Sequence, residues 1–456
     1  MIINTNNTGS GIPLRKIALP VFFLFFSLIG GRSYAQEKKV LSVNEAVQLG
    51  IENSKTLKLS KNRIEEALSR YNQTKDEVLP KASASLMFNH AEFLDNQFQL
   101  PGSNEALNLP SGANAYIGTV SIEQLIFAGN KLKYAAESSK LLSQIAGSDS
   151  EKLKDDVVYA VINDCYNLYR IEQSQKVIKQ NLEAVDKQID QAQKFFNQGI
   201  VTKNDVLRFQ LQRKNIELTQ VDLETNRKVV NYNLTILLGL PENLDLDIST
   251  FGNTSSQPVL INSFIDSALT EREDIKQTSI RNELAEINIK NIKADLYPTV
   301  GVGGNLYYIK PSANPLPENN QVLAPVAVAA SVKWNIDKLW TTKNKLTEAR
   351  IQKSEALLNR ELVSDNIKTE VNREFQAYLR SLDRVKILES SIEQAKENDR
   401  ILESKYKNNI ASVTDRIDAE TQLYQALINL ELAKADAGLA FFTLLKTSGT
   451  LKSNNL

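Results

Sequence analysis

The feature that most constrains how this 456-residue chain folds is an internal duplication. Four blocks of the first half recur in the same order in the second half: KTLK as EDIK, VLPKASAS as LYPTVGVG, VSIEQLIF as ASVKWNID, and FFNQGIVTKNDVL as KYKNNIASVTDRI. The offset is 218 residues between Pro80 and Pro298 but 210 between Gly199 and Asn409, because the first half has the longer loop in between. This pattern predicts one supersecondary unit built twice.

Each unit is predicted to have the order helix–strand–strand–helix–helix. The predicted helices are 43–78, 128–197 and 201–238 in the first copy, and 263–296, 338–407 and 413–446 in the second. A helix of about 70 residues is roughly 105 Å long, a length that the two shorter helices of a unit would match if they were placed end to end.

Apolar residues at alternating steps of three and four residues predict coiled-coil packing between these helices. The two seams are Leu182, Val185, Ile189, Ala192 and Phe196, and Leu388, Ile392, Ala395, Leu402 and Tyr406. The charged residue Asp399 takes one position of the second seam.

Period-two alternation of apolar with small or polar residues predicts the strands, for example over 116–124 and 326–334. Each strand is roughly 10 residues long, as in membrane β-barrels, and aromatic residues lie toward strand ends as in their interfacial girdles. These aromatic residues are Phe88, Tyr116, Tyr308 and Trp334. A soluble sheet half buried against the helices would show the same alternation. Four strands cannot close a barrel, which needs about eight, so a barrel would require several chains.

The N-terminus has the pattern of an export signal. Arg15 and Lys16 precede an apolar run, and Ser33 and Ala35 flank Tyr34 at a small-x-small cleavage site. We therefore expect residues 1–35 to be a signal peptide, with an N-terminal membrane anchor as the alternative.

Composition argues against several classes of function. Lys and Arg together number 54, as do Asp and Glu, and this balance is not that of a nucleic-acid-binding protein. A single cysteine, Cys165, and a single histidine, His90, leave no multi-histidine metal site and little room for a catalytic triad. Phosphate-binding and dinucleotide-binding glycine motifs are absent from the sequence. We expect no enzyme, no cofactor and no metal site.

Together, the signal sequence, the duplicated unit and the G-x-x-x-x-x-D stretch from Gly199 to Asp205 resemble the TolC-like outer-membrane efflux proteins, over 41–445. The resemblance implies a mainly α fold with a β-barrel portion: a homotrimer whose helices form an α-barrel and whose strands form one shared 12-stranded transmembrane β-barrel.

The same resemblance implies an organisation and a function. The first repeat would be 36–240, an equatorial segment 241–262, the second repeat 263–446 and a C-terminal tail 447–456. The protein would sit in the outer membrane, in contact with its lipid, with a long periplasmic extension. It would be the passive exit duct of a tripartite efflux or type I secretion system, docked to a periplasmic adaptor and, through it, to an inner-membrane pump. No nucleic-acid partner is expected, and the sequence does not identify the cargo.

The two helix-hairpin tips would form the periplasmic end. Gly199 and Asn409 are residues that tolerate the left-handed conformation that ends a helix. Each is followed by an [ST]-x-x-D sequence typical of a capping box for the return helix. These pairs are Thr202 with Asp205 and Ser412 with Asp415.

The second tip carries the candidate gate. Asp415 and Asp418 are three residues apart on one helix face, so a trimer would stack two rings of carboxylates there. By resemblance, these aspartates narrow the closed entrance, while Asp205 and Tyr406 link neighbouring hairpins. The arginine that the family has nearby is replaced by Ala411.

Two further interpretations remain open at this point. A periplasmic adaptor would also have a signal and a helical hairpin, although it usually has one hairpin between β-rich modules. An exported coiled-coil structural protein would share the long helices. Duplication and four long helical arms favour the duct over the adaptor.

Overall fold

The computed structural model describes residues 38–92, 97–99, 101–102, 106–108, 112–248, 260–313 and 322–451. The predicted signal peptide lies outside these residues, as do 249–259 of the predicted equatorial segment and 452–456 of the tail. No helix in the described ranges is long and apolar enough to cross a membrane.

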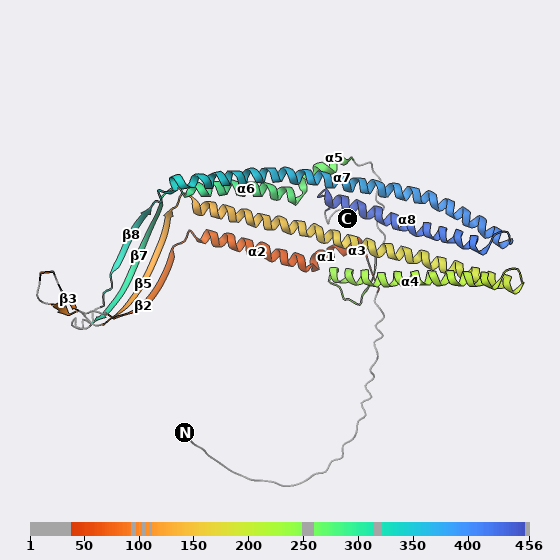
Figure 1. Ribbon diagram of the computed structural model, residues 1–456, viewed down its shortest axis with the longest axis horizontal. Helices are drawn as coiled ribbons and strands as arrows, with labels where there is room; N and C mark the ends of the chain where they lie inside the picture. The colour runs from red at the N-terminus through yellow and green to blue at the C-terminus, as the bar shows by residue number, and fades with distance from the viewer. Residues whose placement is uncertain are drawn as a thin grey trace, which may run out of the picture. The chain divides into compact units, whose positions relative to one another are not determined.

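The helices follow the duplication seen in the sequence (Figure 1). Those of the first copy are α1 Val43–Asn53, α2 Lys55–Asp76, α3 Lys131–Asn197 and α4 Lys203–Leu238, and those of the second are α5 Ile261–Glu271, α6 Glu273–Ala294, α7 Lys338–Lys407 and α8 Val413–Thr447. The long helix α3 packs against α1, α2 and α4, and α7 packs against α5, α6 and α8. Each long helix therefore lies beside shorter helices that follow one another along its length, as the lengths predicted.

The first helix of each unit is broken, where the sequence predicted one continuous helix. Ser54 interrupts the first copy: it caps α2, and its side chain accepts a hydrogen bond from the N–H of Leu57 at 3.2 Å. Arg272 interrupts the second copy with ψ of 133°. Tertiary contacts hold both breaks, because Asn53 donates to the carbonyl of Leu238 at 2.9 Å, and the Arg272 side chain donates to the carbonyl of Thr447 at 3.1 Å. Helix propensity could not indicate these contacts.

Four antiparallel strands form the main sheet, in the order β2–β5–β7–β8. Their bounds are Lys81–Glu92, Gly112–Phe127, Thr299–Ala313 and Val326–Lys333. Two smaller pairs are described: β1 Lys38–Leu41 lies parallel to β6 Asp245–Ile248, and β3 Gln97–Gln99 lies antiparallel to β4 Ala106–Asn108.

The register of the main sheet separates an apolar face from a polar one. One row across the four strands is Ala84, Val120, Leu306 and Val326, and the adjacent row, on the other face, is Ser83, Ser121, Asn305 and Ala327. Val120, Leu306 and Val326 are 45%, 46% and 73% exposed. Figure 1 shows the strands extending beyond the ends of the helices, with no helix over either face. The chain does not form a sheet half buried against its own helices.

The largest buried cluster lies where α1, α3, α4, α8 and the β1–β6 pair meet. Val161, Leu168, Leu234 and Leu238 are fully buried in it, and so is Cys165, whose thiol pKa is raised to about 12 by burial. The inter-repeat strand β6 is thus packed against the helices of the first repeat.

Candidate gate at the helical hairpin tips

The first tip joins α3 to α4 through a tight reversal. Gly199 has φ of 71°, in the left-handed region, and its N–H donates to the carbonyl of Phe196 at 2.9 Å. Thr202 then begins the return helix. Its backbone N–H donates to Asp205 Oδ2 at 2.8 Å, and the N–H of Asp205 donates to Thr202 Oγ1 at 3.3 Å. The two residues form a reciprocal capping box.

The second tip joins α7 to α8 with the same geometry. Asn409 has φ of 58°, and its N–H donates to the carbonyl of Tyr406 at 3.0 Å. Ser412 donates from its backbone N–H to Asp415 Oδ2 at 3.1 Å, and the N–H of Asp415 donates to Ser412 Oγ at 3.1 Å. An asparagine in one copy and a glycine in the other therefore support the same turn.

An apolar cluster joins the two tips within the chain. Tyr406 is buried between the two hairpins, with its ring 6.0 Å from that of Phe195 and 5.9 Å from that of Phe209. Val206 and Val413, from the first turns of α4 and α8, belong to the same cluster. The hairpins of one chain are thus packed directly against each other at their ends.

Tyr406 and Asp205, which resemblance links to the gate, do not hydrogen-bond to each other in this structure. The Tyr406 hydroxyl is buried and has no hydrogen-bond partner among the described residues. Burial raises the pKa of Tyr406, and the nearby Asp205 carboxylate raises it further. The Asp205 side chain accepts hydrogen bonds from Thr202 in the capping box.

Asp415 and Asp418 are both exposed near the start of α8. Hydrogen bonds from the hydroxyl and the backbone N–H of Ser412 lower the pKa of Asp415. The Asp415 carboxylate therefore stays charged at any pH near neutrality, so the residue combines its capping contact with a fixed negative charge at the tip.

Arg416 lies between these aspartates in sequence but points away from them. Its side chain is buried and donates to Oδ1 of Asp399 on α7. The charged seam position at Asp399 is thereby paired across the hairpin. The charge of Asp399 in an otherwise apolar seam was the sequence signal that this residue needs a partner, and the packing supplies Arg416.

Two hydrogen bonds between the hairpins were not indicated by the sequence. Arg208 Nη1 of α4 donates to Thr414 Oγ1 of α8 at 2.6 Å, and Gln212 Nε2 donates to Thr421 Oγ1 at 3.1 Å. These side chains are exposed on helices that are far apart in sequence, so only the packing reveals their pairing.

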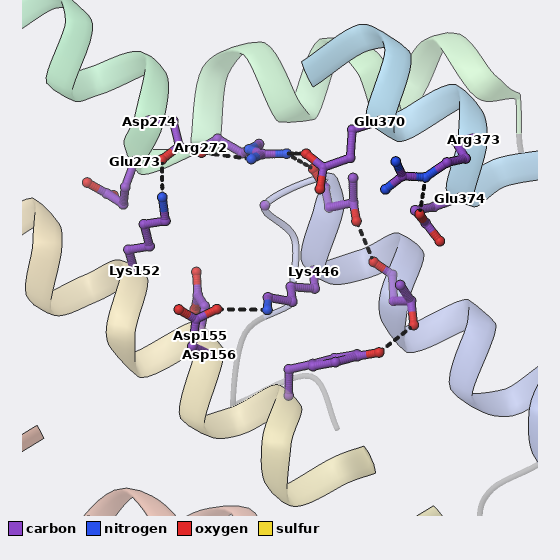
Figure 2. A pocket seen from close by; sticks show the side chains of 14 residues that line it. Lys152, Asp155, Asp156, Arg272, Glu273, Asp274, Glu370, Arg373, Glu374 and Lys446 are labelled. Atoms are coloured by element: carbon purple, nitrogen blue, oxygen red, sulfur yellow. Dashed lines mark hydrogen bonds and ion pairs between the residues drawn. The ribbon is translucent and has the colours of Figure 1, made fainter. Parts of the chain in front are cut away.

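A second charged cluster lies far from the tips, around the break at Arg272 (Figure 2). Arg272 donates to Glu370 Oε2 and to Asp274 Oδ2, both at 2.7 Å, and Lys152 donates to Asp274 Oδ1 at 2.7 Å. Lys446 pairs with Asp156 at 2.7 Å. These contacts join α3, α6, α7 and α8.

The cavity between these helices has a volume of about 220 Å³, and both signs of charge line it. Arg272, Lys152 and Lys446 are each paired with a carboxylate of the chain, which indicates a structural brace. Burial raises the pKa of Asp155 to about 6 in the same cavity. Across the described ranges, no group of three or more His, Cys, Asp or Glu side chains could hold a metal ion.

The fold and the paired tips are those of outer-membrane duct proteins. Comparison with known protein families and solved structures gives the same class. The family model described as "Outer membrane efflux protein" matches residues 46–240 and 264–450, once over each repeat. The chain belongs to the outer membrane efflux protein family. It is an efflux channel protein and not an enzyme.

Solved structures of similar channels share the fold. The Campylobacter jejuni CmeC outer membrane channel is 16% identical, with 98% of this chain and 96% of that chain covered, at a TM-score of 0.73. The outer membrane protein VceC from Vibrio cholerae is 15% identical, with coverage of 89% and 96% and a TM-score of 0.72. The open state of the Neisseria gonorrhoeae MtrE outer membrane channel is 14% identical, with coverage of 90% and 90% and a TM-score of 0.69. No curated protein sequence matches this one.

Proposed function

We propose that the chain is the exit duct of a tripartite efflux or type I secretion system, assembled as a homotrimer in the outer membrane. The observation that carries this proposal is the exposed apolar face of the four-stranded sheet, on which Leu86 is 74% and Val328 is 86% exposed. Lipid is the partner that such a face fits, because apolar surface of this extent is costly in water.

The edges of the sheet support a shared barrel. Strands β2 and β8 each pair on one side only in the sheet order. Because all four strands alternate in direction, β8 of one chain is antiparallel to β2 of the next in a closed ring. Three chains would then close a barrel of about 12 strands and remove every open edge.

Aromatic residues lie at two levels of the sheet, and their separation fits a bilayer. At one level Phe88 packs on Tyr116 with ring centroids 5.0 Å apart. At the other, Phe127 packs on Tyr297 at 6.5 Å, beside the start of the helices. The strand from Tyr116 to Phe127 is about 35 Å long at ~3.3 Å per residue, and a tilt of about 40° reduces its height to ~27 Å. This height is close to the ~25 Å apolar band of membrane barrels.

The helices also present apolar surface that the other described residues leave exposed. On α4 the exposed apolar residues are Leu207, Leu211, Leu218, Val221, Val229 and Ile236. Their spacing places them along one side of the helix. This stripe is suited to packing against a second copy of the chain in an α-barrel.

In such a trimer the tips would form the gate. Six tips would surround the periplasmic mouth, and Asp415 and Asp418 would line it as two rings of three carboxylates that attract cations. Ala411 packs at the edge of the apolar cluster between the tips. The closing contacts of this protein would therefore rest on the packing around Tyr406 more than on an arginine at that position.

The remaining assignments belong to the same proposal. Residues 1–35 would be the export signal, and 241–262 and 447–456 would lie at the equator of the α-barrel. A periplasmic adaptor would dock at the tips and connect them to an inner-membrane pump. Cargo selection would belong to that pump, because six tips around an opening would form a mouth and not a closed ligand pocket.

Fractionation with cross-linking tests this proposal. Cysteine pairs introduced into β2 and β8, on a Cys165→Ser background, should cross-link into trimers in outer-membrane fractions. A pair within one chain, on the neighbouring strands β5 and β7, is the matched control and should cross-link without producing oligomers. A protein that salt releases from membranes as a monomer would overturn the proposal.

A further inference from the structure

One carboxylate on α8 is buried and accepts no hydrogen bond from any residue that the structure describes. Glu420 is 2% exposed, and neither of its carboxylate oxygens has a hydrogen-bond partner among the described residues. Gln188 of α3 lies beside it, is 8% exposed, and its Oε1 also lacks a donor. Leaving buried acceptors unsatisfied is expensive, so each such group requires an explanation.

Protonation of the Glu420 carboxylate would satisfy these unpaired acceptors. A protonated carboxyl group is a donor as well as an acceptor, and amide rotation can present Gln188 Oε1 to it. The two residues lie on different helices, so the resulting hydrogen bond would join α8 to α3. Both line a cavity of about 460 Å³ between α3, α7 and α8.

The positively charged side chains near Glu420 on α7 and α8 each form an ion pair with another carboxylate. Arg416, one turn before Glu420 on α8, donates to Asp399 of α7. Lys407 of α7 pairs with Glu403 of the same helix at 2.6 Å. Asp399 and Glu403 both face Glu420 and disfavour its charged form.

The remaining polar groups around the cavity do not neutralise Glu420. From α3, Glu183 and Lys187 are exposed at its rim. The Tyr406 hydroxyl of α7 has no partner among the described residues, and the Tyr424 hydroxyl of α8 donates to the carbonyl of Gln180 at 3.3 Å.

The electrostatic balance favours the protonated form. Burial is the largest cause of the raised pKa of Glu420, which is about 7. The charge of Arg416 and the amide of Gln188 lower this pKa, whereas Asp399 and Glu403 raise it. The ordinary pKa of a glutamate in water is 4.5, so the charge of Glu420 depends on whether α8 is packed or solvated at this point.

We propose that Glu420 is a proton-binding site that couples the pH around the helical hairpins to the packing of α8 against α3. Glu420 lies about 8 Å from Asp415 along the axis of α8, so the proton site is next to the candidate gate on the same helix. Its role in gating rests on the proposed function; its effect on helix packing does not.

The direction of the coupling follows from the two pKa values. Packing raises the pKa of Glu420 from 4.5 to about 7, so the packed form binds the proton more tightly. The proton therefore stabilises the packing of α8 against α3. This stabilisation is fully present at pH values below the pKa of solvated glutamate, and it is lost as the pH rises through the pKa of Glu420 in the packed form. Within that interval, each pH unit shifts the equilibrium toward the unpacked form by up to about tenfold.

Hydrogen exchange on the full-length protein in detergent or nanodiscs tests the site. Exchange of 413–430, corrected for the intrinsic effect of pH, should become faster by up to about tenfold per unit between about pH 5 and 7. Glu420→Gln mimics the protonated side chain and should remove this pH dependence while keeping the packing. Glu183→Gln is the matched control, because it removes a carboxylate from the exposed rim of the same cavity and should behave as wild type.

The outcomes separate this inference from the proposed function. An unchanged exchange rate across this pH range in the wild type, or equal pH dependence in Glu420→Gln, would overturn the proton site. Channel recordings of the same samples report on the duct independently. A conducting channel with pH-independent exchange contradicts only the proton site, whereas pH-dependent exchange without conductance contradicts only the duct.

Discussion

Arg416 of α8 and Asp399 of α7 form a buried ion pair across the second hairpin, with side chains that are 7% and 16% exposed. The pair lies in the seam of the coiled coil, where an unpaired charge would be costly. It explains how a charged residue is tolerated in the apolar series that begins at Leu388. Because Arg416 is held in this pair, its side chain does not contribute to the candidate gate, although Arg416 stands between Asp415 and Asp418 in sequence.

The first prediction concerns this pair. Arg416→Met should destabilise the tip half of the second hairpin by up to about 3 kcal/mol, because it leaves the largely buried Asp399 side chain, 16% exposed, without a partner. The double variant Asp399→Leu/Arg416→Met removes both charges and should recover most of that loss. The free energy of local opening, measured by hydrogen exchange over 395–425, checks both. A change below about 0.5 kcal/mol in the single variant would contradict a buried pair.

The second prediction concerns the caps. Ser412→Ala removes the hydroxyl that accepts the N–H of Asp415 and should cost the start of α8 about 1 kcal/mol. Thr202→Ala should cost the start of α4 a similar amount, because the two capping boxes share their geometry. Ser412→Gly is the control and should cost only a few tenths of a kcal/mol. Hydrogen exchange at the first turn of each helix is the readout, and equal costs for alanine and glycine would argue against capping.

The third prediction uses two glycines in long helices. A Cβ on Gly438 of α8 would lie 2.5 Å from the Tyr166 hydroxyl and 2.6 Å from its Cε1, so Gly438→Ala should destabilise by about 1–3 kcal/mol. Gly147→Ala on α3 meets nothing within 4 Å and should instead stabilise by up to about 1 kcal/mol. Opposite shifts in thermal stability of the purified protein are expected. A neutral Gly438→Ala would contradict the close contact between Gly438 and the Tyr166 ring.

Much of this fold could be predicted from the sequence. The bounds of α7 coincide with the predicted 338–407, because helical periodicity continues up to the turn residue Asn409. The breaks at Ser54 and Arg272 could not be predicted in the same way. They depend on contacts with Leu238 and Thr447, which are far away in sequence and join only when the units pack.

The candidate site likewise has residues that could be predicted from the sequence and residues that could not. The turn and cap residues were recognisable because their roles are local, requiring a left-handed backbone at Asn409 or a hydroxyl three residues before an aspartate. The partner of Asp399 and the surroundings of Glu420 were not recognisable, since the residues that provide them come largely from other helices. Phe196 was assigned to the seam by its spacing, yet it is 38% exposed and its neighbour Phe195 packs on Tyr406 instead. The helix rotates slightly against a strict heptad near its end.

The fourth prediction concerns the proposed carboxylate rings. Asp415→Asn/Asp418→Asn keeps an oxygen that can accept the capping hydrogen bonds but removes six charges from a trimeric mouth. The concentration of a multivalent cation that half-blocks the channel should rise by about tenfold or more, equivalent to about 1.4 kcal/mol of lost binding. Because hydrogen bonds from Ser412 lower the pKa of Asp415, block of the wild type should persist at pH 5. Equal block in both proteins would exclude the rings.

Conductance of the purified wild-type protein in a planar lipid bilayer tests the central claim most directly. A trimeric duct predicts discrete single-channel steps, selective for cations, that are sensitive to multivalent cations added on the side of the helical tips. A protein that inserts and stays a folded trimer yet conducts no ions, even when the tip contacts around Tyr406 are loosened by Phe209→Ala, would contradict the account.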